Sequence, residues 1–383
     1  MAKDEKQPNK STANSDLRLQ GAALLPDVAQ PVSKKSPISP SSVFRAEIIL
    51  PLLFLIYPLI PGLDNWLFGR TNTSIGSQLT LIFIFSILAI GLNVVVGYSG
   101  LLHLGIAAFF GIGAYITGIL TVPSYPFQFG FWIALAIATF GAGLLGVILA
   151  APTLRLRGDY LALVTLGFGE VVRFSIRNFE EITAGTRGLN PLPAPVLPFV
   201  AEASWKIDYR WFYYLTLAIL LAVLWLMRNL ERSRLGRAWI AVREDELAAT
   251  CMGINAAKVK LSAFALSAAL AGLAGGLYAT KLTSTAGPDA FDFNRSMIML
   301  CCIILGGLGS LRGTLLGVLI LIGFDNVLAP ILDGVIQQSG INASNSRFLV
   351  FSNWRMFIFG MTLILIMRYR PMGLLPARMA KAA

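Results

Sequence analysis

The sequence predicts an all-α, polytopic membrane protein with about 8–10 transmembrane helices, some of them short or broken. Two observations lead to this prediction. Of the 383 residues, 56% are hydrophobic and 13% are charged, whereas soluble domains carry roughly 25% charged residues. Apolar runs of roughly 20 residues, the length that crosses about 30 Å of hydrocarbon, also recur along the chain.

The chain begins with a polar segment, residues 1–42, whose Ser, Pro, Asn and Lys content predicts a disordered tail. The first apolar run begins near Ile48, so we expect no cleavable signal peptide. Pro51, Pro58 and Pro61 predict that this first span is bent or short.

Nine further apolar runs follow. They lie near residues 75–96, 100–121, 129–151, 159–176, 211–228, 259–282, 295–309, 313–332 and 355–369. Between the first two runs, Gly97-Tyr98-Ser99-Gly100 predicts a tight hairpin. Gly306-Gly307-Leu308-Gly309-Ser310 predicts a break in a helix, which is tolerated at membrane depth where the break is buried in protein or lines a cavity.

Positively charged residues orient the spans, because loops rich in Arg and Lys stay in the cytoplasm. The basic segment 229–258 is therefore placed inside. The connections 177–210, 283–294 and 333–353 then face outside, and an even number of spans puts both termini, including the tail 371–383, in the cytoplasm.

Several classes of function find no support in the residues. The net charge of +11 gathers at the ends of apolar runs, as membrane topology requires, and not in a nucleic-acid-binding patch. Gly141-x-Gly143-x-x-Gly146 matches a dinucleotide motif but lies inside an apolar span, and no GxxxxGK[ST], HExxH or GxSxG motif occurs. The three cysteines, Cys251, Cys301 and Cys302, have neither metal-site nor disulfide spacing. We therefore expect neither an enzyme nor a cofactor or metal site in this chain.

Polar residues inside spans are costly and often functional. Glu170 and Arg173 are three positions apart on one helix and can form an ion pair. That pair either only stabilises its helix or lies at the outer mouth of a pathway. Asn93, His103 and the dipeptide Asp325-Asn326 are weaker candidates of the same kind.

The most informative stretch is the charged, helix-forming segment Asn229–Asn255, which lies between two apolar runs. One interpretation is an amphipathic helix on anionic lipid. The other is a docking site for a cytoplasmic protein, in which Ala248 and Ala249 permit close seating. Charged residues in the segment would then pair with the partner, and Gly253 is well placed to cap the helix. The candidate docking residues are Gly236, Arg237, Arg243, Glu244, Asp245, Glu246, Ala248, Ala249 and Gly253.

Several stretches together resemble one known family. They are Gly97–Leu102 with the following LGIAAFFGIGAY, Leu154–Ala162, Thr165–Glu170, Glu244–Asn255, Lys260–Phe264, Ala271–Ala279, Gly306–Ser310 and Arg370–Pro376. This pattern resembles the branched-chain amino acid (LIV-type) permeases of bacterial ABC importers. Many members of that family have His at the position of Ile106, whereas this chain has His103 instead, and the 42-residue tail is unusual.

The resemblance implies the subunit similar to the second of two paired permeases, in the bacterial inner membrane. It also implies a second permease, two cytoplasmic ATPases that bind ATP-Mg, and a periplasmic substrate-binding protein. The coupling helix of the family corresponds to Gly236–Gly253. Residues 43–370 are then the permease domain, and ATP-driven motion of the coupling helix would switch the bundle between outward- and inward-facing states.

The substrate and the pathway stay open at this point. Branched-chain or other neutral amino acids are expected, with urea or short-chain amides as the alternative, and an ion-coupled secondary carrier is the rival class. The candidate pathway residues are Asn93, His103, Glu170, Arg173, Gly306, Gly307 and Gly309.

Overall fold

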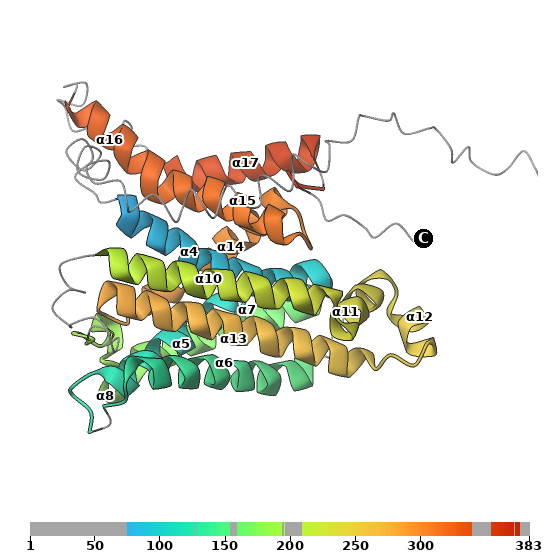
Figure 1. Cartoon of the computed structure of the whole chain (residues 1–383), viewed down its shortest axis with the longest axis horizontal. Helices are drawn as coiled ribbons and strands as arrows, with labels where there is room; N and C mark the ends of the chain where they lie inside the picture. Colours follow the sequence, from blue (N-terminus) through green and yellow to red (C-terminus); the bar gives the residue numbers. More distant parts are fainter. Residues whose placement is uncertain are drawn as a thin grey trace, which may run out of the picture. The chain divides into compact units, whose positions relative to one another are not determined.

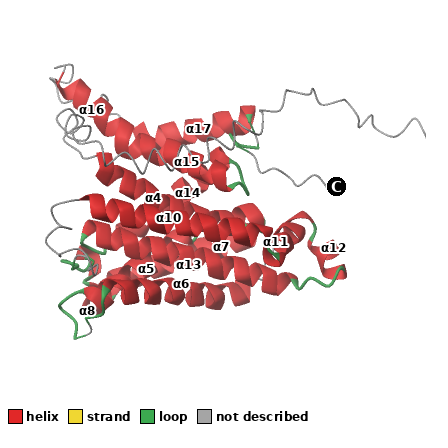
Figure 2. Cartoon of the chain, viewed as in Figure 1, coloured by secondary structure: helices red, strands yellow, loops and turns green. Residues whose placement is uncertain are grey.

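The computed structural model describes residues 75–126, 128–153, 159–193, 195, 209–338, 354–370 and 372–375. Within these ranges every regular element is a helix, as Figure 2 shows. The predicted tail 1–42, the predicted first span near Ile48 and most of the predicted tail 371–383 lie outside the described residues. The all-α prediction is confirmed.

Figure 1 shows how the helices are arranged. In chain order they are α4 (Ile75–Asn93), η2 (Val94–Tyr98), α5 (Ile106–Thr121), α6 (Phe131–Thr153), α7 (Asp159–Asn178), α8 (Glu180–Thr183), η3 (Gly185–Arg187), α10 (Tyr209–Arg232), α11 (Arg234–Glu244), α12 (Glu246–Cys251), α13 (Ala256–Leu282), η4 (Pro288–Phe291), α14 (Phe293–Gly306), α15 (Leu311–Gly323), η5 (Phe324–Leu328), α16 (Ala329–Gln338) and α17 (Arg355–Tyr369). The segments η2 and η5 are π-helical, and η3 and η4 are 3₁₀-helical.

Each of the nine apolar runs predicted after the first contains a helix. Among the described residues, five helical stretches are long and apolar enough to span a membrane: Gly76–Tyr98, Phe131–Pro152, Arg210–Arg232, Ala256–Leu282 and Leu311–Asp333. Two shorter apolar helices are Ile106–Thr121 and Phe357–Tyr369. The helix α7 is long enough but carries too many charged side chains to meet the same criterion.

The predicted helix over 100–121 is wrong at its start, and so is the predicted hairpin at 97–100. The π-helix continues through Tyr98, and the chain then stays non-helical from Ser99 until α5 begins at Ile106. Gly100 has a φ of 70°, a left-handed conformation that favours glycine and ends regular helix. Within this segment Ser99, His103 and Gly105 are buried, whereas Gly100 and Leu102 are exposed.

The long helix α13 is the centre of the bundle and packs against α4, α5 and α6. Its glycines make this packing close. A methyl group on Gly275 would overlap the carbonyl oxygen of Phe110 on α5, and one on Gly113 of α5 would overlap the backbone of Gly272. Close backbone approach replaces the hydrophobic driving force that lipid does not supply.

The predicted break after α14 is also confirmed. The helix ends at Gly306, and Gly307 and Gly309 have φ angles of 123° and 76°, which other residues rarely adopt. The backbone N–H groups of Leu374 and Leu375 donate to the carbonyls of Leu305 and Gly306, at 2.9 and 2.8 Å. Residues of the predicted C-terminal tail are therefore bound to this break.

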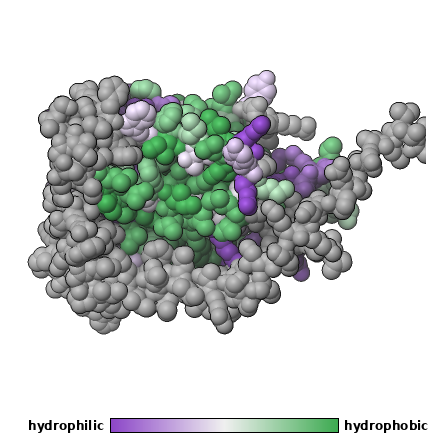
Figure 3. All heavy atoms as spheres, turned by 90° about the horizontal axis from the view of Figure 1, so that it is seen from above, coloured by the Kyte–Doolittle hydropathy of each residue, from purple (hydrophilic) through white to green (hydrophobic). Residues whose placement is uncertain are grey.

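Two of the three connections predicted to share one side of the membrane, 177–210 and 283–294, meet. The N–H of Thr285 donates to the carbonyl of Leu189, and the N–H of Leu192 donates to the carbonyl of Thr283. Figure 1 shows α8 at one end of the helices and α11 and α12 at the other. In Figure 3, hydrophobic residues fill the middle of the visible described face, and hydrophilic residues gather toward the end where α11 and α12 lie.

Candidate functional site

The segment between α10 and α13 folds as two short helices, each begun by a side-chain cap. Ser233 Oγ accepts from the N–H of Gly236 at the start of α11. Asp245 Oδ1 accepts from the N–H groups of Leu247 and Ala248, at 2.8 and 3.0 Å, at the start of α12. Such caps satisfy N–H groups that have no partner within the helix.

The end of α12 is closed by a Schellman motif. The N–H of Gly253 donates to the carbonyl of Thr250, and the N–H of Ile254 donates to the carbonyl of Ala249. Gly253 has a φ of 83°, which a residue at this position requires and glycine supplies most easily. The predicted capping position of Gly253 is confirmed.

The inner face of the two helices is anchored on α13. Trp239 is 1% exposed, and its Nε1 donates to the carbonyl of Val259 and to Ser262 Oγ, at 3.1 and 3.0 Å. Val242, Ala249 and Ala256 form a small buried cluster beside it. Trp239 was not identified from the sequence, although Gly236, Trp239 and Val242 lie at i, i+3 and i+6, a spacing that indicates an inward face.

The outer face of α12 is exposed and apolar at its tip. Leu247 is 73% exposed and Met252 is 84% exposed. Among the predicted docking residues, those with exposed side chains or backbone are Arg237, Arg243, Glu244, Asp245, Ala248 and Gly253, whereas Gly236 and Ala249 are buried. Glu246 is half-buried and pairs with Lys260. Ala248 and Ala249 therefore face opposite ways, and only Ala248 is open to a partner.

Arg243 extends from α11 to the neighbouring segment η2. Its guanidinium donates a hydrogen bond to the carbonyl oxygen of Gly97 in η2. It also lies against Gly309, where an added methyl group would be 3.1 Å from Nη1. The N–H of Gly309 donates to Asn93 Oδ1 at 3.0 Å. Residues from three distant parts of the sequence, Asn93 with Gly97, Arg243 and Gly309, thus meet at one junction.

His103 lies in the non-helical segment before α5 and is 1% exposed. Its ring packs against the rings of Phe109 and Phe264, with centroids 5.9 and 5.2 Å away. Neither ring nitrogen has a hydrogen-bond partner in the part of the chain that the structure describes. The adjacent N–H of Leu104 is held by Thr165 Oγ1 at 3.1 Å. His103 is therefore enclosed by aromatic rings and does not take part in the Arg243 junction.

Glu170 and Arg173 form the predicted ion pair, with 2.9 Å between Oε2 and Nη1. The pair is not confined to its helix, because Arg173 Nη2 also bonds Asp289 Oδ1 of η4 at 2.9 Å. Asp289 was not identified from the sequence, since it lies 116 positions away. The arginine joins α7 to the connection that precedes α14.

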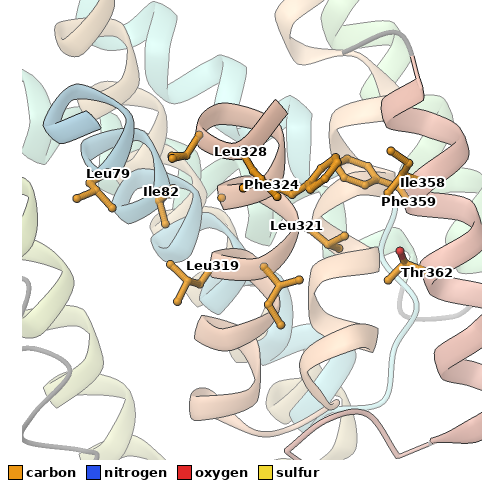
Figure 4. A pocket seen from close by; sticks show the side chains of 12 residues that line it. Leu79, Ile82, Leu319, Leu321, Phe324, Leu328, Ile358, Phe359 and Thr362 are labelled. Carbon is orange, nitrogen blue, oxygen red and sulfur yellow. The ribbon is translucent and has the colours of Figure 1, made fainter. Parts of the chain in front are cut away.

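A cavity of about 460 Å³ lies among α4, α15, η5 and α17 (Figure 4). Leu79, Ile82, Phe324 and Phe359 are among its lining residues, and none of the lining residues is charged. A zwitterionic solute would leave its charges unpaired there, so this cavity does not suit an amino acid. In the described residues, no group of three or more His, Cys, Asp or Glu side chains is placed to hold a metal ion.

Comparison with known proteins places this arrangement in a family. Residues 74–367 match the model of the permease component of branched-chain amino acid transport systems. The chain belongs to this family. The chain is therefore a multi-pass membrane permease component.

Individual relatives agree with this assignment. The chain is 37% identical over 316 residues to the high-affinity branched-chain amino acid transport system permease protein LivM of Escherichia coli K12, covering 78% of this chain and 69% of the relative. It is 25% identical over 256 residues to LivH of the same organism, covering 62% and 79%. It is 28% identical over 302 residues to the ribose import permease protein RbsC of Haemophilus influenzae, covering 77% and 86%. No solved structure matches the chain.

Similarity to both LivM and LivH indicates a permease that works in a paired system. The identity to LivM is higher and extends over more of this chain. This agrees with the resemblance to the second of two paired permeases that the sequence motifs indicated.

Proposed function

We propose that this chain is one of two different permease subunits of a bacterial ABC importer for branched-chain and other neutral amino acids. The observation that supports this most directly is the 37% identity to LivM over most of the chain. A periplasmic binding protein would deliver the solute, and two cytoplasmic ATPases, which bind ATP-Mg, would supply the energy. The protein would lie in the inner membrane with both termini in the cytoplasm.

The proposed ATPase docking site is the outer face of α11 and α12. Exposed apolar side chains surrounded by charged residues are typical of a docking surface. Leu247 and Met252 supply the apolar contact, and Glu244 and Asp245 supply charges at its rim. The alternative, in which α12 lies on anionic lipid, is disfavoured because these two acidic side chains are exposed beside the apolar tip.

Docking is tested by purifying the complex in mild detergent from cells that co-express all subunits. We expect Leu247→Asp to remove the ATPases from the purified permease, because a charge would replace a contact that is buried only in the complex. Leu247 is exposed in this chain, so the variant should still fold. Ala257→Ser, an exposed position in the first turn of α13, is the matched control. Retention of the ATPases by Leu247→Asp would contradict the proposed docking face.

We propose the substrate from family membership. The described spans contain few charged side chains that could bind and select a solute. Specificity would then reside largely in the binding protein. The test is ATP-dependent uptake by vesicles that contain the complete complex, with labelled leucine, other neutral amino acids, urea and ribose as separate substrates. Leucine uptake is expected, whereas uptake of urea or ribose without leucine would assign the complex to another branch.

A further inference from the structure

We infer that Arg243 is the positioning residue that transmits motion of the docking helices α11 and α12 to two breaks between helices. The first break is the non-helical segment Ser99–Gly105, and the second is the break between α14 and α15. This inference rests on the proposed function. Trp239 and Glu246 bind α13, to which α12 is joined by a short connection. Arg243 instead bonds to η2, 146 positions earlier in the chain. It therefore couples the docking helices to a separate part of the bundle.

The chemistry of the contact suits this role. Carbonyl groups at the end of a helix lack intrahelical partners and favour a cation nearby. Gly97 supplies such a carbonyl at the end of η2, and the guanidinium of Arg243 occupies the site. Gly100 packs against the stem of the same side chain, where an added methyl group would lie 2.8 Å from Cγ. The arginine stem thus lies against Gly100, and its guanidinium bonds to Gly97 at the end of η2.

Asn93 connects η2 to the second break, which lies between α14 and α15. Asn93 lies one turn before Gly97, and its Oδ1 accepts from the N–H of Gly309 in the break between α14 and α15. A methyl group on Gly97 would overlap the Asn93 side chain and come within 2.5 Å of the Gly309 nitrogen. A displacement of Arg243 would therefore move Gly97 against both Asn93 and Gly309, because no free space separates them.

The junction also has the features of an element with more than one arrangement. The segment η2 is π-helical, a form that is rare and frequent at functional sites. Asn93 Nδ2 and Tyr98 Oη are buried without a hydrogen-bond partner among the described residues. Unpaired buried groups disfavour the present arrangement relative to one that pairs them. Coupling between distant sites requires an element that can switch in this way.

The test compares Arg243→Gln with Arg228→Gln in the complete complex. Each variant removes one exposed arginine, but Arg228 lies on α10, outside the proposed docking face. The guanidinium of Arg243 is bonded to Gly97, so for Arg243→Gln we expect the ATPases to stay bound and to hydrolyse ATP, while leucine uptake per ATP falls about tenfold. Arg228→Gln should keep the wild-type ratio. An unchanged ratio in Arg243→Gln, or loss of the ATPases from it, would overturn the inference.

A second measurement begins with the wild-type complex. Hydrogen exchange at the amides of residues 99–105 and 307–310 should differ between the nucleotide-free and ATP-bound complexes. The difference should persist in Arg228→Gln and disappear in Arg243→Gln. Identical exchange in the two wild-type states would overturn the inference. Failure of the proposed function is a different result, in which the wild-type permease binds no ATPase and shows no ATP-dependent uptake.

Discussion

Lys260 and Glu246 are 14 positions apart and meet where α12 turns back toward α13, with 2.6 Å between Nζ and Oε1. The lysine side chain is 10% exposed and the glutamate side chain is 44% exposed. The pair therefore joins the docking helix to the central helix of the bundle. A buried ammonium group without an acceptor is costly. Loss of the glutamate should therefore destabilise the protein more than loss of the lysine.

The first prediction concerns this pair. Glu246→Gln should lower stability by about 1–2 kcal/mol, because it replaces a charge-assisted hydrogen bond of a buried lysine with a weaker one. Glu244→Gln, an exposed neighbour on the same segment, should change stability by less than about 0.5 kcal/mol. The melting temperature of the purified complex checks both. Equal shifts for the two variants would show that the pair does not stabilise α12.

A second prediction separates two roles of Asp245. Asp245→Ala should lose the cap of α12 and destabilise that helix by about 1 kcal/mol. Asp245→Asn should keep the cap, since asparagine caps equally well, and remove only the charge. Hydrogen exchange of the Leu247 and Ala248 amides reports the cap, and co-purification of the ATPases reports docking. If Asp245→Asn exposes the amides as much as Asp245→Ala does, the hydrogen bonds to Oδ1 are not what holds the helix.

Arg173 leads to a prediction of non-additivity. Glu170→Gln and Asp289→Asn should each cost less than about 1 kcal/mol, because the sites are partly exposed and the arginine keeps its other carboxylate. The double variant leaves Arg173, whose side chain is 23% exposed, without an anion and should cost more than the sum of the two single changes. Thermal unfolding of the four proteins measures this coupling. Leucine uptake by the same variants tests the predicted position of the pair at the mouth of the pathway.

Two glycines should respond in opposite directions to the same substitution. Gly275→Ala should destabilise the bundle by about 3 kcal/mol or prevent folding, because the methyl group meets backbone atoms of Phe110 and Ala114. Gly167→Ala on α7 has no neighbour within 4 Å of the new carbon, so it should be neutral or stabilise the helix by about 0.5–1 kcal/mol. Size-exclusion chromatography and melting of the detergent-purified protein compare them. Equal behaviour of the two variants would mean that α5 and α13 are not closely packed there.

The sequence by itself determined the features that depend on local pattern. Apolar runs of spanning length predicted the helices, and the charged stretch Asn229–Asn255 between two of them predicted a folded segment outside the hydrocarbon. The glycines Gly306, Gly307 and Gly309 predicted the break after α14. The conformational freedom of glycine is a property of the residue itself and can therefore be read from the sequence. The ordered set of short motifs also predicted the family. Each of these signals is read from the order of residues along the chain, and none requires knowledge of which distant residues meet.

Only the tertiary structure decided which distant groups meet. The bonds from Arg243 to Gly97, from Gly309 to Asn93 and from Arg173 to Asp289 join residues 146, 216 and 116 positions apart. The non-helical course of Ser99–Gly105 also involves distant groups, such as Thr165 Oγ1, which accepts from the N–H of Leu104. The composition of these residues equally fits the start of a span. The physical reason is that local periodicity specifies a helix and its apolar face, whereas the partner of a polar side chain is specified by how the helices pack.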